Sequence, residues 1–67
     1  MAYDEVVIAY AKNLFFELND NGSRMHTYPS IAQKTREHFR DNIDPDTGLK
    51  VSGHSCNKIT DSTVHKW

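Results

Sequence analysis

Residues 59–67 read Ile-Thr-Asp-Ser-Thr-Val-His-Lys-Trp, and this stretch decides the fold class of the chain. Thr60 is a residue type that caps helix N-termini, and Ile59 before it can pack against the first turns. Helical spacing then puts Val64 and Trp67 on one inward face. The stretch therefore predicts a short amphipathic helix. Its outer face would carry polar side chains: Asp61, Ser62, His65 and Lys66.

A second helix is predicted upstream, from Thr27 to about Arg40. Thr27 can serve as its N-cap, and Pro29 suits a first helical turn, where a missing N–H costs nothing. We expect the helix of residues 59–67 to pack onto Ile31 and Ala32, because a small alanine permits close approach of two helices. The complete inner face would be Ile31, Ala32, Thr35 and Phe39.

A first helix is predicted between Tyr3 and Leu18, and the turn Asn19–Gly22 is expected to end it. Apolar residues recur there at helical spacing: Tyr3, Val7, Tyr10, Ala11, Leu14 and Leu18. Further apolar residues widen the stripe beyond what one partner helix would cover: Val6, Ile8, Phe15 and Phe16. This face is either partly exposed, as small domains allow, or it contacts a partner.

Residues 41–57 show no helical periodicity and include the turn sequence of residues 44–48, Asp-Pro-Asp-Thr-Gly. Leu49 and Val51 alternate with polar neighbours, so this stretch is either a loop or a short hairpin. The predicted fold class is therefore all-α, with three helices and a long loop or short hairpin between the second and third.

Length and composition predict one domain over residues 1–67, because 67 residues of which 37% are hydrophobic can bury only a thin core. So small a core leaves little room for a buried active site, and we expect no catalytic residues. Cys56 is the single cysteine, which excludes an internal disulfide, and no apolar run approaches the roughly 20 residues of a membrane span. The acidic start lacks the features of a secretory or transit signal, so a cytoplasmic protein without a membrane partner is expected.

The charged residues are distributed unevenly along the chain. The formal net charge is −1, which disfavours avid nucleic-acid binding, because such binding depends on phosphate neutralisation. The first third carries four acidic residues and one lysine: Asp4, Glu5, Glu17, Asp20 and Lys12. The basic residues follow later: Arg24, Lys34, Arg36, Arg40, Lys50, Lys58 and Lys66. The later elements could therefore face phosphate, while the first helix faces away or meets another subunit.

Residues 27–35 and 59–67 together resemble the helix-turn-helix motif of DNA-binding domains. In the first helix of that motif, an aromatic residue and a cap are followed by Ile-Ala, as in residues 27–35 here. The second helix has the order aliphatic, Ser or Thr, any residue, Ser, Thr, Val, any residue, basic, Trp, as in residues 59–67. The family joins these helices by a short turn, whereas this chain inserts residues 41–58, a loop or wing-like hairpin that could itself touch DNA. The resemblance implies double-stranded DNA as partner. The DNA-binding residues we expect are those of the second helix, Asp61, Ser62, Thr63, His65 and Lys66, with Lys50 and Lys58 of the insertion and Arg36 of the first helix.

Residues 11–35, AKNLFFELNDNGSRMHTYPSIAQKT, most resemble the N-terminal domains of phage small terminase subunits and of transposases. That resemblance implies binding of a specific DNA site to start genome packaging or transposition, and an ordinary transcription regulator stays open as a third role. Such domains begin larger proteins that oligomerise through later segments. We therefore expect an N-terminal part of a longer protein, with homo-oligomer contacts through the first helix or through a C-terminal region.

Three other kinds of site are weighed against DNA binding. His54 and Cys56 form a single pair of potential zinc ligands, whereas structural zinc sites have ligand pairs on two arms. As a catalytic thiol and base, the same two residues have no third residue to orient them. Asp41, Asp44 and Asp46 lack the closing Glu of a calcium loop. No metal or cofactor is therefore expected. The alternative function is a protein-interaction module, such as a phage-type inhibitor, that docks through the apolar face of the first helix.

Overall fold

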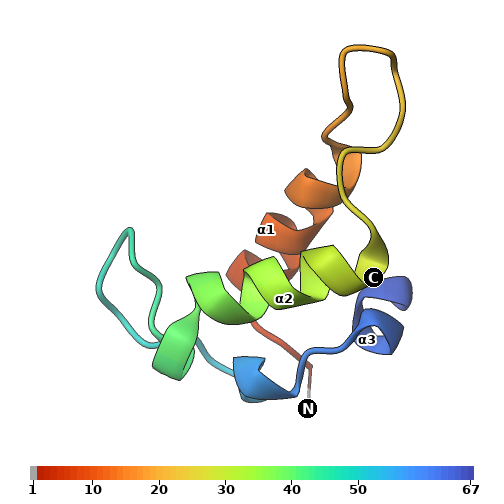
Figure 1. The fold of residues 1–67 in the computed structure, drawn as a ribbon. Helices are drawn as coiled ribbons and strands as arrows, with labels where there is room; N and C mark the ends of the chain where they lie inside the picture. The colour runs from red at the N-terminus through yellow and green to blue at the C-terminus, as the bar shows by residue number, and fades with distance from the viewer. Residues whose placement is uncertain (1) are drawn as a thin grey trace.

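The computed structural model describes residues 2–67, and Figure 1 shows that it is helical. Its elements are α1 (Glu5–Phe16), α2 (Tyr28–His38), the 3-10 turns η1 (Arg40–Asn42) and η2 (Cys56–Lys58), and α3 (Asp61–His65). Within residues 2–67 the only extended pairings are isolated bridges: Tyr3 with Gly53, Leu18 with Arg24, and Ile43 with Lys50. The expected all-α fold with three helices is confirmed.

Helix α1 is shorter at both ends than the sequence pattern predicts. Asp4 caps it, with Oδ1 accepting a hydrogen bond from the Val6 N–H at 2.9 Å. The helix buries Val7 and Ala11 and ends at Phe16, after which the backbone becomes extended. The prediction that Leu18 lies on the inner face is wrong: Leu18 is 53% exposed, because the chain has left the helix before reaching it.

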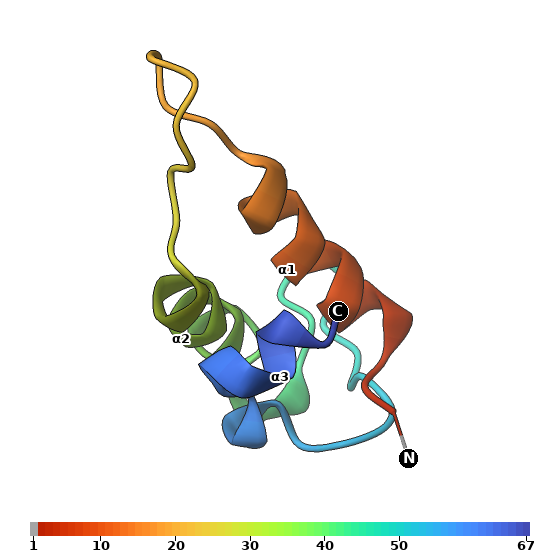
Figure 2. The ribbon, with the colours of Figure 1, turned by 90° about the vertical axis from the view of Figure 1, so that its right-hand side faces the viewer.

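Residues 17–26 form an extended arm that projects away from the three helices, as Figures 1 and 2 both show. The Asn19 N–H donates to the Ser23 carbonyl at 2.7 Å, and the Met25 N–H donates to the Glu17 carbonyl at 3.2 Å. Gly22 takes a φ of +84° near the tip. The turn Asn19–Gly22 therefore reverses the arm and does not end α1, contrary to expectation.

Helix α2 begins at the predicted cap, where the Thr27 hydroxyl accepts a hydrogen bond from the Ser30 N–H. Its expected inner face is confirmed, because these residues are all buried: Ile31, Ala32, Thr35 and Phe39. The helix ends at His38 and not at Arg40. The physical reason is that the backbone leaves the helical region at the C-cap Phe39, with φ −102° and ψ 40°, and Asp41 and Asn42 then follow with φ near +60°.

The connection between α2 and α3 is a loop, and the only strand-like pairing between two of its own residues is the bridge from Ile43 to Lys50. Asn42 organises it: its carbonyl accepts from the Val51 N–H and its side-chain Oδ1 accepts from the Cys56 N–H, each at 2.8 Å. Of the two predicted alternatives, the loop is the better description.

The core lies where α1, α2, η2 and α3 meet. Its buried apolar residues are Val7, Ala11, Ile31, Ala32, Phe39, Cys56, Ile59 and Val64. None of the helices within residues 2–67 combines the length and the apolar character needed to cross a membrane.

Candidate nucleic-acid interface

Thr60 caps helix α3, as predicted, in a reciprocal arrangement with Thr63. The Thr60 hydroxyl accepts from the Thr63 N–H at 3.4 Å, and the Thr63 hydroxyl accepts from the Thr60 N–H at 3.3 Å. Although α3 itself spans five residues, the N–H groups of Lys66 and Trp67 donate to the Thr63 and Val64 carbonyls and continue the turn. Thr63 is half-buried and its hydroxyl is engaged in this cap, so the structure places it within the helix start and not on the outer face.

The inner side of α3 is fastened to α2. Ile59 is fully buried and Val64 is 5% exposed, and both belong to the same cluster as Ile31 and Ala32. Trp67 is half-buried, with its ring edge-on to Tyr3 at 5.4 Å between centroids. The expected packing of this helix against α2 is confirmed.

Arg36 connects α2 to the entry of α3. Its guanidinium donates a hydrogen bond to the main-chain carbonyl of Ile59, and the side chain is half-buried. Its partner in the structure is therefore protein backbone, which gives Arg36 a positioning role for α3.

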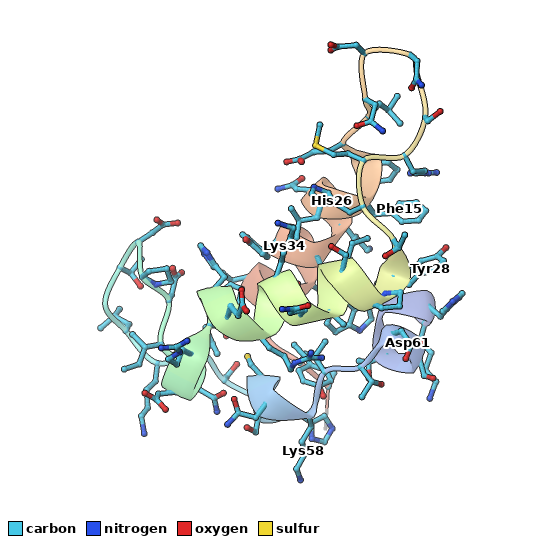
Figure 3. All side chains as sticks on the ribbon, viewed as in Figure 1. Phe15, His26, Tyr28, Lys34, Lys58 and Asp61 are labelled. Carbon is cyan, nitrogen blue, oxygen red and sulfur yellow. The ribbon has the colours of Figure 1, made fainter. Side chains whose placement is uncertain are left out.

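The outer side of α3 carries four exposed residues: Asp61, Ser62, His65 and Lys66. The His65 ring lies against Tyr28 in the first turn of α2, with 3.8 Å between centroids and a tilt of 34°. Figure 3 shows Tyr28 beside α3 and Asp61 at the start of α3. This contact fixes where the imidazole lies, so Tyr28 on α2 supports the outer side of α3, a role that the sequence pattern did not predict. No local sequence signal could have found it, because the contact joins residues far apart in the chain.

The two remaining predicted residues lie in different places. Lys58 is exposed on η2, directly before the start of α3. Lys50 lies in the turn of residues 43–50, at the C-terminal end of α2, whereas α3 lies near the N-terminal end (Figure 1). Lys58 thus adjoins α3 only through the chain, on the turn η2 that leads into it, whereas the turn that holds Lys50 lies at the other end of α2 (Figures 1 and 3). We call Lys58, Asp61, Ser62, His65 and Lys66 the α3 surface.

A mainly apolar cleft of about 360 Å³ lies between α1 and α3. Aromatic side chains form most of its wall, together with Lys12: Phe15, Phe16, Tyr28, His65 and Trp67. The wide apolar stripe of the first helix was the sequence signal for it, and the structure leaves Val6 and Phe16 exposed, Phe16 by 68%.

Cys56 and His54, weighed from sequence as a zinc pair or a thiol–base pair, do not belong to the group of potential metal ligands found among residues 2–67. Cys56 is fully buried, and burial followed by the negative charge of Asp4 raises the pKa of its thiol. His54 is exposed and lies edge-on to Tyr3, at 5.2 Å between ring centroids. A thiol held protonated inside the core is neither a nucleophile nor a ready metal ligand.

Comparison with known proteins adds no relative to this picture. No protein family, no curated protein and no solved structure matches this chain. Function is therefore inferred from the residues and their geometry.

Proposed function

We propose that this chain is a sequence-specific module for double-stranded DNA, of the helix-turn-helix kind, in which α2 supports α3 and the α3 surface enters the major groove. One observation carries the proposal: Ile59 and Val64 are buried against α2 while the opposite side of the same short helix is entirely polar and exposed. A recognition helix needs this division, because its inner side must fix its orientation while its outer side reaches base edges.

Each residue of the α3 surface has a suitable chemistry for a DNA groove. The Ser62 hydroxyl both donates and accepts, and Lys66 can donate to guanine O6 and N7 or to a phosphate. The Asp61 carboxylate accepts from a cytosine amine and repels phosphates otherwise, so it favours a correctly registered complex over non-specific contacts. Lys58 precedes the helix and suits a phosphate contact.

The charge of the surface sets an expected salt dependence. Two lysines, Lys58 and Lys66, give about two phosphate contacts, so the slope of log K against log salt concentration should be roughly −2. Such weak phosphate anchoring is consistent with a net charge of −1, and it suits a module that several copies present to DNA together. The resemblance to small terminase subunits and transposases favours a specific site at the start of packaging or transposition.

The test is a chemical-shift titration of the labelled chain with short random DNA duplexes at low and then moderate salt, followed by selection of a preferred site. We expect shifts concentrated in residues 58–67 that fade as salt rises. Lys66→Ala should weaken binding to all sequences and reduce the salt slope by about 1, whereas Ser62→Ala should lower discrimination between sites by about 1 kcal/mol. Lys34→Ala is the matched control, because Lys34 lies on the side of α2 away from α3 (Figure 3). Equal binding by all three variants would contradict the assignment.

The α1–α3 cleft supports a second candidate, a protein-interaction module, which for this chain would first be contact with another copy. Phe16, 68% exposed at the cleft, is the observation that favours it. This function predicts that the NMR signals of α1 broaden as protein concentration rises and do not respond to DNA. In Phe16→Ser the same signals should stay sharp. Shifts in the α3 surface on adding DNA would favour the first proposal.

A further inference from the structure

Three potential metal ligands meet at the C-terminal end of α2. His38 is the last residue of that helix, and Asp44 and Asp46 lie in the turn that follows η1. One ligand atom from each residue lies within 4.8 Å of the other two. They come from two separately folded elements, so the sequence spacing of the aspartates alone does not reveal the group.

Asp44 is the member that points to a cation. It is only 8% exposed as a residue, although it carries a carboxylate. One oxygen, Oδ1, accepts a hydrogen bond from the Asp46 N–H at 2.9 Å. Within residues 2–67 no Lys, Arg or His forms an ion pair with it. Within residues 2–67 no buried side-chain oxygen lacks a hydrogen-bond partner, so the second oxygen of Asp44 is open to solvent, where an ion could bind it beside His38 and Asp46.

Both halves of the group are held by other contacts. The His38 ring stacks on Tyr10 with 4.0 Å between centroids and 16° between planes, and Phe39 meets it edge-on at 4.8 Å. In the turn, the Asp44 N–H donates to the Leu49 carbonyl at 2.9 Å, and the Gly48 N–H donates to the Asp44 carbonyl at 2.7 Å. Packing thus orients the imidazole, and main-chain hydrogen bonds orient the carboxylates, before any ion arrives.

We propose that His38, Asp44 and Asp46 bind one divalent transition-metal ion of the Zn²⁺ class. One imidazole nitrogen and two carboxylate oxygens suit Zn²⁺, whereas Ca²⁺ takes six to eight oxygens. Tetrahedral Zn²⁺ holds such ligands roughly 3.4 Å apart, so small side-chain rotations must contract the group from its present span. The three ligands leave a fourth position for water. The bound ion would tie the turn of residues 43–50 to α2, and this proposal is independent of DNA binding.

The experiment is a titration of the full chain with ZnCl₂ at neutral pH, followed by calorimetry and by the imidazole signals of the four histidines. Co²⁺ serves as a coloured probe of the same coordination. We expect one ion per chain, a selective shift of the His38 signals and a melting temperature that rises with Zn²⁺. His38→Ala should abolish binding. Asp46 is exposed, so Asp46→Asn leaves the core unchanged. It should lower the affinity for Zn²⁺ by about tenfold or more, because substitutions around metal sites commonly reduce metal affinity by that factor.

Two matched controls keep the result specific. Asp41→Asn removes a neighbouring exposed carboxylate, and His54→Gln removes an exposed histidine elsewhere, so both should bind Zn²⁺ as the parent chain does. Binding that survives Asp46→Asn unchanged, or that is lost in His54→Gln, would overturn the proposal. So would the absence of any Zn²⁺ response in the His38 signals.

Discussion

The guanidinium of Arg36 on α2 hydrogen bonds to the main-chain carbonyl of Ile59, the residue that precedes the cap of α3. Ile59 is fully buried, so its side chain anchors this junction from the core while Arg36 anchors its backbone from the rim. The two contacts together set the angle at which α3 leaves the loop. Arg36 was expected from the sequence to contact DNA directly. In the structure it contacts the backbone that leads into α3, the helix proposed to bind DNA.

Arg36→Ala should therefore act on stability and on helix placement. Losing a hydrogen bond from a charged donor to a half-buried carbonyl should lower the free energy of unfolding by about 1–3 kcal/mol. DNA affinity should fall while the salt slope stays unchanged, which separates Arg36 from Lys66. Urea denaturation and binding at several salt concentrations measure both effects. A slope reduced as in Lys66→Ala would instead make Arg36 a phosphate contact.

Of the three glycines, Gly53 is the one least able to accept a side chain. A Cβ there would lie 2.1 Å from the main-chain carbonyl oxygen of Ala2, and its φ is +80°. Gly53→Ala should lower the free energy of unfolding by about 2 kcal/mol or more, since backbone strain and displacement of the N-terminal segment add together.

Gly22→Ala provides the control for that substitution. Gly22 has nearly the same φ, +84°, but a Cβ there meets nothing within 4 Å. Gly22→Ala should therefore lower the free energy of unfolding by only about 1 kcal/mol, the cost of placing a residue with a Cβ in the left-handed conformation. Equal losses in the two variants, measured by urea denaturation, would contradict the close approach at Gly53.

Acid should weaken the fold partly through Asp4. Hydrogen bonds from the Ser52 N–H, the Val6 N–H and the Ser52 hydroxyl hold the pKa of this carboxyl below its ordinary 3.8. A lowered folded-state pKa means that the contribution is present above the ordinary value and is lost as pH falls through the folded value. The urea midpoint should therefore drop on acidification below about pH 4, and Asp4→Asn should show a smaller drop. Identical acid profiles would exclude this role.

Cys56 should resist alkylation in the native state. Its thiol is fully buried, and burial raises its pKa, with a smaller contribution from the Asp4 charge. Because the thiolate is the reactive form, labelling by iodoacetamide at neutral pH should proceed only through unfolding and should accelerate sharply in urea. Fast native labelling, followed by mass spectrometry, would show that the loop of residues 43–55 opens readily.

Local signals account for the parts of the fold that the sequence predicts correctly. Thr27 and Thr60 both cap helices, and the helical spacing of Ile31, Thr35 and Val64 identifies buried faces. The arm could not be predicted in the same way. A polar turn with glycine suits a helix C-terminus as well as a chain reversal, and only the pairing of Leu18 with Arg24 decides between them.

Helical periodicity predicts which residues of α3 point outward, and this is the part of the α3 surface that could be read from the sequence. That periodicity correctly placed Ser62 and Lys66 outside, but it says nothing about contacts between distant residues. Arg36 meets a carbonyl 23 residues away, and Lys50 ends up beyond the other end of α2 because an aperiodic loop carries it there. His38 approaches Asp44 for the same reason, since η1 turns the chain back.

The arm of residues 17–26 supplies none of the core residues, and its tip is small, polar and exposed. Exposed tips of this kind are where chains tolerate insertions and where proteases cut first. Because side-chain packing, and not the arm, holds α1 against α2, the covalent link between them can be opened or lengthened at Asn21 and Gly22. A fluorophore or a second domain inserted there would leave the α3 surface free.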